Sequence, residues 1–196
     1  MNQYFTNNEN LRSELRVLKY SFGEYNFMFN SDLGVFSKDK LDEGSRTLIE
    51  TYFKLGRKNV KVLDVGAGSG LIGITLAKVM DCEVTMVDVN HRAMHLCEMN
   101  IKANGVKAKV FESDGYAKVN DKYDVIITNP PIRAGKEVYL RIINEAFQYL
   151  AKEGELWFVM RNNQGVKTIY KDLKTRYNTE ILCKNKGFYV ILAKTG

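Results

Sequence analysis

A glycine-rich loop at residues 66–70, here called the glycine loop, is the first feature that suggests chemistry. Glycine stands at positions 66, 68 and 70, and Asp64 lies two residues before the first of them. Glycines let the chain turn sharply and let a ligand approach the backbone. This spacing suits S-adenosylmethionine better than a dinucleotide, because that cofactor has no pyrophosphate to cradle. Asp64 would bind its amino group, and its carboxylate would face the helix N-terminus after Gly70.

Two further acids follow the next two predicted strands. Asp88 comes 18 residues after Gly70, and an acid at this place can accept both ribose hydroxyl groups. Asp114, beside Gly115, follows the third strand, where an adenine amino group would need an acceptor. The predicted cofactor contacts in this part of the chain are Asp64, Gly66, Ala67, Gly68, Gly70, Asp88, Val89, Asp114 and Gly115.

Both prolines of the chain lie in Asn129-Pro130-Pro131-Ile132, here called the proline loop, after a predicted buried strand. Proline fixes φ and has no N–H, and a residue before proline is held extended, so this loop is stiff. The Asn129 oxygen and the Pro130 carbonyl would each accept one N–H of an exocyclic or carboxamide amine. Those bonds localise the nitrogen lone pair and aim it at the methyl group of the cofactor. We predict all four residues to be catalytic, with Asn129 also contacting the cofactor.

Strands and helices alternate along the chain in a way that would position these residues. Apolar runs and alternation predict strands at residues 14–22, 25–30, 61–65, 83–89, 107–112, 123–129, 155–161, 179–185 and 188–194. Helical spacing is found at residues 48–55, 71–80, 91–105, 135–154 and 165–177. The first two strands flank Gly23-Glu24 and read as a hairpin.

Strands joined by helical crossovers imply a parallel, doubly wound sheet. We predict an α/β, Rossmann-like fold with a seven-stranded, mostly parallel sheet and one antiparallel strand near the C-terminus. Helices would cover both faces of the sheet, and the hairpin would precede it. Ligands of such sheets bind at the carboxyl ends of the strands, near the topological switch point. The three acids and the proline loop all follow predicted strands, so we expect one site there.

Composition limits the class of protein. Of 196 residues, 45% are hydrophobic and 27% charged, which is typical of a globular domain and excludes a disordered or collagen-like chain. Cys82, Cys97 and Cys183 form no CxxC pair, and His91 and His95 have no evident third partner, so we predict no disulfide framework and no metal. No signal peptide or membrane span is apparent. We expect a soluble, cytoplasmic protein without membrane contact.

The net charge of +6 favours a polyanionic partner, with nucleic acid the leading candidate. Arg133 and Lys136 follow the proline loop, and Arg161 follows the strand at residues 155–161. We predict that these three residues contact RNA. The lysines of the helix at residues 165–177 are interpreted as a solvated face.

Five segments resemble one protein family: LGVFSKDKLDEGS, VLDVGAGSG, VDVN, NPPIRAGK and KGFYVI. They are similar to class I S-adenosylmethionine-dependent methyltransferases and, more narrowly, to the RsmC-like 16S ribosomal RNA guanine-N2 methyltransferases (methyltransferase small domain). The resemblance implies S-adenosylmethionine as cofactor, the exocyclic amine of a 16S guanine as target, and ribosomal RNA or the small ribosomal subunit as partner. It also implies that residues 35–37 close over the cofactor, with Phe36 in contact. We expect one methyltransferase domain over residues 1–196, with the hairpin and covering segment at 1–45 and the catalytic core at 46–196.

The chain departs from the family at Ile132, where many relatives carry an aromatic residue that stacks on the target base. Stacking on the base would then come from Phe36 or Tyr139, or would be weaker. Alternative functions are a release-factor-type protein-glutamine methyltransferase, a DNA adenine methyltransferase, a non-catalytic RNA-binding or ribosome-assembly module, and a nicotinamide oxidoreductase. The net charge and the GVFS segment argue against the first, and the chain length against the second. Intact Asp64, Asp88 and Asn129 argue against the third, and the glycine spacing against the fourth. The oligomeric state stays open.

Overall fold

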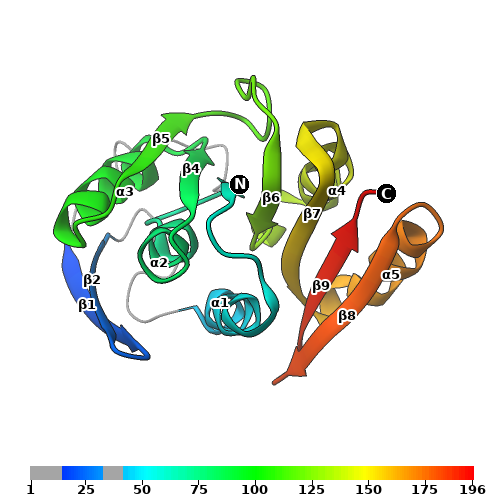
Figure 1. The fold of residues 1–196 in the computed structure, drawn as a ribbon, viewed down its shortest axis with the longest axis horizontal. Helices are drawn as coiled ribbons and strands as arrows, with labels where there is room; N and C mark the ends of the chain where they lie inside the picture. The colour runs from blue at the N-terminus through cyan, green and yellow to red at the C-terminus, as the bar shows by residue number, and fades with distance from the viewer. Residues whose placement is uncertain (1–14, 33–41) are drawn as a thin grey trace.

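The computed structural model describes residues 15–32 and 42–196 (Figure 1). The strands are β1 (Arg16–Phe22), β2 (Tyr25–Ser31), β3 (Lys61–Val65), β4 (Glu83–Asp88), β5 (Ala108–Glu112), β6 (Tyr123–Thr128), β7 (Leu150–Arg161), β8 (Asn178–Asn185) and β9 (Phe188–Lys194). The helices are α1 (Glu43–Leu55), α2 (Leu71–Val79), α3 (His91–Ala103), α4 (Lys136–Glu145) and α5 (Val166–Lys174). Three short 3₁₀ helices are η1 (Ile132–Ala134), η2 (Ala146–Tyr149) and η3 (Asn162–Gln164).

Seven strands form one sheet in the order β5-β4-β3-β6-β7-β9-β8. Strands β3 to β7 pair in parallel, whereas β9 runs antiparallel to both β7 and β8. The strand order reverses after β5, which returns the chain to the other side of β3, so the topological switch point lies between β3 and β6. This arrangement confirms the predicted sheet with its single antiparallel strand near the C-terminus.

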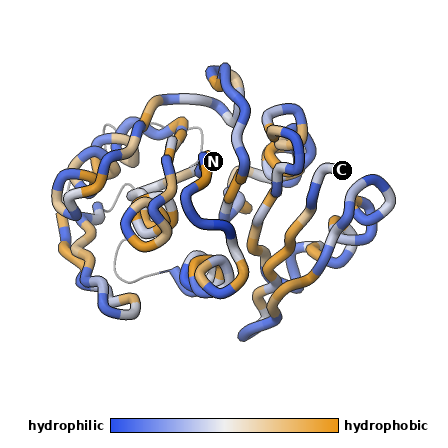
Figure 2. Tube along the Cα trace, viewed as in Figure 1, coloured by the Kyte–Doolittle hydropathy of each residue, from blue (hydrophilic) through white to orange (hydrophobic). Residues whose placement is uncertain are grey.

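Two hydrophobic clusters fill the two faces of the sheet, and neighbouring residues of β7 belong to different clusters. Trp157 packs with Tyr52 of α1 at a ring-centre distance of 4.7 Å, whereas Phe158 shares its cluster with Ile142 of α4 and Leu173 of α5. Side chains alternate along a strand, so both faces of β7 are buried. Figure 1 shows α1 and α2 on one side of the sheet and α4 and α5 on the other, and Figure 2 shows hydrophobic stretches along β7 and β9.

The N-terminal hairpin forms a separate two-stranded sheet, as predicted. Tyr20, Phe27 and Phe29 are buried on its inner face. Asn100 of α3 and Asn104, the C-cap of that helix, pair with the free edge of β2. Asn104 Oδ1 accepts from Met28 N at 2.9 Å, and Asn100 Oδ1 accepts from Asn30 N at 2.7 Å. An edge strand leaves such groups unpaired, and these side chains satisfy them and attach the hairpin to the core.

The predicted helix at residues 135–154 is wrong in its second half. Helix α4 ends at Glu145, and β7 begins at Leu150, which pairs with Tyr123 of β6. The intervening residues form the short 3₁₀ helix η2, in which Phe147 stacks on Tyr177 with 3.6 Å between ring centres. Pairing in the sheet therefore overrides local helical spacing. Among the described residues, no helix has the length and apolar character needed to cross a membrane.

Candidate active site

The glycine loop and the proline loop begin side by side at the carboxyl ends of β3 and β6. These strands pair in parallel, and the Thr128 hydroxyl donates a 2.7 Å hydrogen bond to the Val65 carbonyl. A Cβ at Gly66 would lie 4.0 Å from Pro131 Cδ and within 4 Å of nothing else among the described atoms. The two loops therefore face one another across one space.

The three glycines of the glycine loop have different surroundings. All have positive φ, at 73° for Gly66, 58° for Gly68 and 93° for Gly70. A Cβ at Gly68 would meet no described atom within 4 Å, whereas one at Gly70 would lie 2.8 Å from Ile74 Cδ1 and 2.9 Å from Cys97 Sγ. The first two glycines thus leave the backbone open to a ligand, and the third lets the loop pack against the core. Ala67 between them is half-buried.

Asp88, at the end of β4, fixes the glycine loop from the side. The carboxyl is buried, and Oδ2 accepts a 2.9 Å hydrogen bond from Gly68 N while Oδ1 accepts one of 2.8 Å from Asn90 N. Burial raises the pKa of Asp88, and these N–H donors oppose the rise. Two carboxylate oxygens offer about four lone-pair sites, so Asp88 can still accept ligand hydroxyls. Val89 follows it, half-buried against the core.

Asp64 carries an unsatisfied oxygen beneath the glycine loop. Its side chain is 1% exposed, and Oδ2 accepts a 3.1 Å hydrogen bond from Gly73 N. No described residue donates to the buried Oδ1. Burial raises the pKa of Asp64 to about 7, opposed by the Gly73 N–H and increased by the charge of Asp88. A buried carboxylate without a partner is costly, so a cationic ligand group would stabilise it. Asp64 Oδ1 could accept a hydrogen bond from the ammonium group of an amino-acid-like cofactor.

The third acid, Asp114, lies in the turn after β5. Its side chain is 42% exposed, and Oδ1 accepts a 2.7 Å hydrogen bond from Arg141 Nη2 of α4. Gly115 is buried with a φ of 56°, and its carbonyl accepts from the Ser113 hydroxyl at 2.7 Å. The arginine leaves the second oxygen of Asp114 for another donor. The pairing with Arg141 was not part of the sequence prediction.

In the proline loop, the two polar ends of the Asn129 side chain have different partners. Nδ2 donates to Asp42 Oδ2 at 2.8 Å and to Ser45 Oγ at 3.0 Å, whereas no described residue donates to Oδ1. The Pro131 carbonyl accepts from Ala134 N at 3.0 Å. Among the described residues, nothing donates to the Pro130 carbonyl. The loop therefore offers two acceptors from adjacent residues.

The predicted RNA contacts lie at the same end of the sheet. Arg133 and Lys136 are exposed directly after the proline loop, and Ile132 before them is half-buried. Arg161 ends β7 and is exposed, with its guanidinium carbon 4.6 Å from the ring centre of Phe188 in β9. Basic side chains thus follow both strands β6 and β7 where these strands end.

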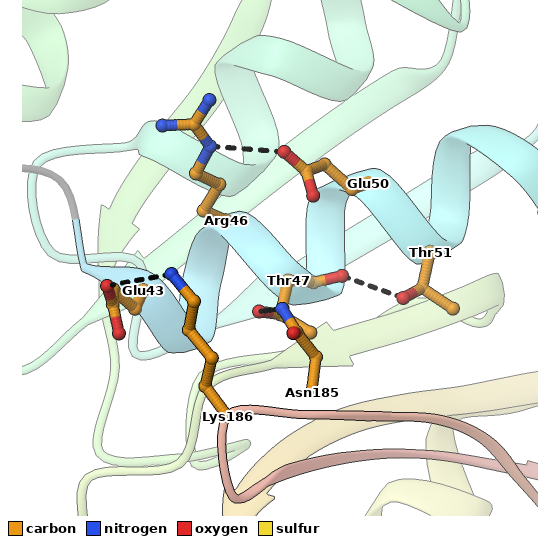
Figure 3. A network of polar contacts seen from close by, with 7 residues as sticks. All are labelled: Glu43, Arg46, Thr47, Glu50, Thr51, Asn185 and Lys186. Carbon is orange, nitrogen blue, oxygen red and sulfur yellow. Dashed lines mark hydrogen bonds and ion pairs between the residues drawn. The ribbon is translucent and has the colours of Figure 1, made fainter.

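The end of β8 and the turn between β8 and β9 contact helix α1. Lys186 Nζ lies 3.6 Å from Glu43 Oε1, and Asn185 Nδ2 donates to Thr47 Oγ1 at 3.5 Å (Figure 3). A Cβ on Gly44 would lie 2.9 Å from Cε1 of Phe188, the first residue of β9, so α1 packs tightly against β9 at Gly44. The close packing of Gly44 fixes the first turn of α1 against β9, and Ser45 of this turn accepts the hydrogen bond from Asn129 of the proline loop.

Some sequence predictions fall elsewhere. Phe36 and residues 35–37 lie outside the described residues. Within residues 15–32 and 42–196, no three His, Cys, Asp or Glu side chains are grouped to hold a metal ion. His91 instead lies 3.2 Å from Glu112 of β5. Asp42 and Ser45, which have no predicted role, belong to the LDEGS segment that resembles the family.

Comparison with known proteins identifies relatives over most of the chain. The family model described as "Methyltransferase small domain" matches residues 26–192. "Uncharacterized protein YbxB" of Bacillus subtilis (strain 168) is 36% identical over 196 residues, which is 97% of this chain and 97% of that protein. "Ribosomal RNA small subunit methyltransferase C" of Shewanella halifaxensis (strain HAW-EB4) is 46% identical over 105 residues, which is 53% of this chain and 30% of that protein.

Among solved structures, a T. thermophilus 16S rRNA N2 methyltransferase (RsmC), in complex with AdoMet and guanosine, is similar with a TM-score of 0.84. It is 26% identical, and the match covers 95% of this chain and 52% of that one. The chain therefore spans nearly the whole Bacillus relative but only about half, or less, of these two methyltransferase relatives.

Proposed function

Because the chain belongs to the methyltransferase small domain family, we propose that it transfers a methyl group from S-adenosylmethionine to the exocyclic amine of a guanine in small-subunit ribosomal RNA. The observation that carries the proposal is the proline loop, whose Asn129 Oδ1 and Pro130 carbonyl have no donor among the described residues. This loop faces the glycine loop, with the Cβ position of Gly66 4.0 Å from Pro131. An amine acceptor pair and a cofactor loop therefore share one space.

The residues around the glycine loop fit the proposed cofactor. S-adenosylmethionine supplies its methyl group on a positively charged sulfur, which keeps the electron pair of the broken bond. Asp64 would bind the α-ammonium with its unpartnered Oδ1, and Asp88 would accept the ribose hydroxyls. The N-terminus of α2, which begins after Gly70, would face the α-carboxylate. Asp114 would accept from the adenine amine with the oxygen that Arg141 leaves.

The proline loop would orient the amine. The lone pair of an exocyclic amine is delocalised into the base, which makes the nitrogen a poor nucleophile. One N–H donated to Asn129 Oδ1 and one to the Pro130 carbonyl would hold the nitrogen lone pair toward the methyl group. The surplus proton leaves to water once the new carbon–nitrogen bond has formed. Orientation and electrostatics then carry the rate, and no strong base is required.

Support for a ribosomal RNA substrate comes from charge and from the relatives. The net charge is +6, and Arg133, Lys136 and Arg161 would contact phosphates around the target base. Such contacts add affinity without sequence preference and make binding salt-dependent. The relatives named as small-subunit methyltransferases, and the guanosine bound to the T. thermophilus protein, favour a guanine of that RNA. This substrate would place the protein in the cytoplasm.

Transfer of labelled methyl groups into separated bacterial components tests the proposal. The components, taken from a strain that lacks the gene, are small subunits, large subunits, naked 16S RNA, tRNA and soluble protein. We expect label in small-subunit RNA that is recovered as N2-methylguanosine after nuclease digestion. Label in tRNA or in protein would contradict the substrate assignment, and absence of label from every component would contradict the enzyme assignment.

A further inference from the structure

We propose that Asp42 is a positioning residue, which decides which end of the Asn129 amide faces the target amine. The inference rests on the proposed function, because it concerns the residue that we propose orients the amine. It assigns a role to the LDEGS segment, which precedes the proline loop by more than 80 residues.

Both carboxylate oxygens of Asp42 are engaged. As the N-cap of α1, Asp42 accepts a 2.8 Å hydrogen bond from Gly44 N on Oδ1, and its carbonyl accepts from Arg46 N at 2.9 Å. Oδ2 accepts the 2.8 Å bond from Asn129 Nδ2. The carboxylate is therefore fixed between the first turn of α1 and the proline loop.

A side-chain amide has two ends of nearly the same size and opposite hydrogen-bonding character. A carboxylate only accepts hydrogen bonds, so the NH₂ end of Asn129 must face Asp42. The oxygen then lies at the other end, where an amine that donates N–H needs it. The reversed amide would set oxygen against oxygen at Asp42 and would offer NH₂ to an amine. Both contacts would be repulsive.

Ser45 completes the contact without choosing the orientation. Its hydroxyl oxygen accepts from Asn129 Nδ2 at 3.0 Å and lies 3.5 Å from Asp42 Oδ2. A hydroxyl group both donates and accepts, so it could pair with either end of the amide. The orientation is therefore set by the carboxylate.

If Asp42 only capped the helix, Asp42→Asn would be nearly harmless, whereas a role in orienting the Asn129 amide predicts that it is damaging. Asparagine caps helices about as well as aspartate, whereas alanine is a poor cap. In Asp42→Asn, the new Oδ1 would still accept from Gly44 N, which turns the new Nδ2 toward Asn129. Asn129 would then present its oxygen to residue 42 and its NH₂ to the substrate.

The test compares Asp42→Asn with Asp42→Ala. For Asp42→Asn we expect kcat to fall about 100-fold, as for loss of an oriented group at a reacting atom, with cofactor affinity and melting temperature nearly unchanged. For Asp42→Ala the amide is free to take either orientation, so kcat should fall about tenfold or less, while the melting temperature drops about 2–4 °C. The proposal is overturned if Asp42→Asn keeps kcat within about threefold of wild type, or if Asp42→Ala is the slower variant.

Glu43→Gln is the matched control, because it removes one negative charge from the same helical turn. It should leave kcat within about twofold of wild type, since an exposed ion pair contributes little. A loss as large as that of Asp42→Asn would show that charge, and not amide orientation, is responsible, and would overturn the proposal.

A second readout needs no activity. The side-chain NH₂ of Asn129 gives a pair of ¹H–¹⁵N NMR signals, which Asn129→Ala identifies by their loss. In wild type these protons should be shifted downfield by the carboxylate acceptor, and Asp42→Asn should move them upfield and speed their exchange with solvent. Unchanged signals would contradict the inference. If wild type methylates protein or tRNA instead of ribosomal RNA, the proposed function fails, but the NMR comparison and the order of the two variants still decide the role of Asp42.

Discussion

The glycine loop and the proline loop begin on neighbouring strands, yet they are held by different parts of the chain. Asp88 reaches the glycine loop across 20 residues of sequence, and Asn100 holds the Ser69 carbonyl across 31. The proline loop is held through Asn129 by Asp42, 87 residues earlier in the chain. Tertiary contacts hold both loops, but those of the glycine loop join residues that are closer in the sequence than the contact of the proline loop.

The two loops also differ in charge. Two buried acids, Asp64 and Asp88, lie under the glycine loop, whereas exposed bases, Arg133 and Lys136, follow the proline loop. Under the proposed function, cofactor binding and substrate contact are then separate tasks with largely separate residues. A substitution in one loop should impair its own task and leave the other nearly intact.

The largest effect is expected for Asn129→Ala, which removes an amine acceptor. Methyl transfer should fall about 1000-fold, the upper end of what one oriented group contributes, while affinity for S-adenosylmethionine stays within about twofold of wild type. Calorimetry and single-turnover transfer measure the two quantities. Asn178→Ala, exposed at the start of β8, is the matched control and should change neither. Transfer that survives within tenfold would remove Asn129 from the mechanism.

Asp88→Ala should show the reverse pattern. Loss of the ribose acceptor should weaken S-adenosylmethionine binding about 100-fold, and unsatisfied N–H groups of Gly68 and Asn90 should destabilise the fold by about 2 kcal/mol. Transfer at saturating cofactor should change much less. Calorimetry and thermal unfolding provide the measurements, and Glu83→Gln, at the other end of β4, serves as control. Unaltered affinity in Asp88→Ala would place the ribose elsewhere.

The raised pKa of Asp64 predicts pH-dependent cofactor binding. With a pKa of about 7, the carboxyl is largely protonated below neutral pH, and the cofactor ammonium needs the charged form. Affinity should therefore rise about tenfold from about pH 5.5 to about pH 7, below the range where an α-amino group loses its proton. Calorimetry in buffers of different ionisation enthalpy should detect proton release on binding. Asp64→Asn should abolish this pH dependence, which would assign it to Asp64 and not to Asp88. A wild-type affinity that does not change with pH would contradict the role of Asp64.

The free energy of unfolding should change with pH in the direction opposite to that of cofactor affinity. A pKa raised in the folded state means that the native protein binds a proton that the unfolded chain has lost, so the free energy of unfolding of the cofactor-free protein should decrease from about pH 4 to about pH 7. Cys97 keeps its proton over this range, because burial holds its pKa well above its usual value. Denaturant unfolding should show a smaller decrease in Asp64→Asn than in wild type, because Asp88, whose pKa burial also raises, still contributes in the variant.

The smallest effect is expected for the bases after the proline loop. The double variant Arg133→Gln/Lys136→Gln should raise KM for RNA about five- to tenfold and reduce the slope of log KM against log salt by about one to two. Cofactor affinity should not change. Lys152→Gln, exposed at the opposite end of the sheet, controls for net charge. An unchanged salt slope would show that these residues do not meet phosphates.

The fold, and the position of the glycine loop and its acids at one end of the sheet, could be predicted because their sequence signals are local. Asp64 and Asp88 lie at or near the ends of two short apolar runs, and the glycines mark the turn between strand and helix, so these two strands and their acids follow from spacing alone. The same local view extended α4 to residue 154, although Leu150 pairs with Tyr123 in the sheet. The spacing of apolar residues in this segment does not indicate that pairing.

The partner of the proline loop could not be predicted in the same way. Asp42 precedes a helix and is explained locally by capping, which its bond to Gly44 N confirms. Its second oxygen contacts Asn129 only because α1 packs over β7 and β9 and brings its first turn to the end of β6. Because helix capping already accounts for an aspartate at position 42, the sequence gives no sign of its contact with Asn129. Only the folded structure shows that contact.

The most direct test of the account is a structure of the protein with S-adenosylhomocysteine and guanosine bound. We expect the exocyclic amine of guanosine to lie about 3 Å from both Asn129 Oδ1 and the Pro130 carbonyl, with Asn129 Nδ2 still donating to Asp42. Asp64 and Asp88 would contact the amino-acid and ribose parts of the cofactor product. A guanine bound away from the proline loop, or an Asn129 amide that turns its NH₂ toward the base, would contradict it.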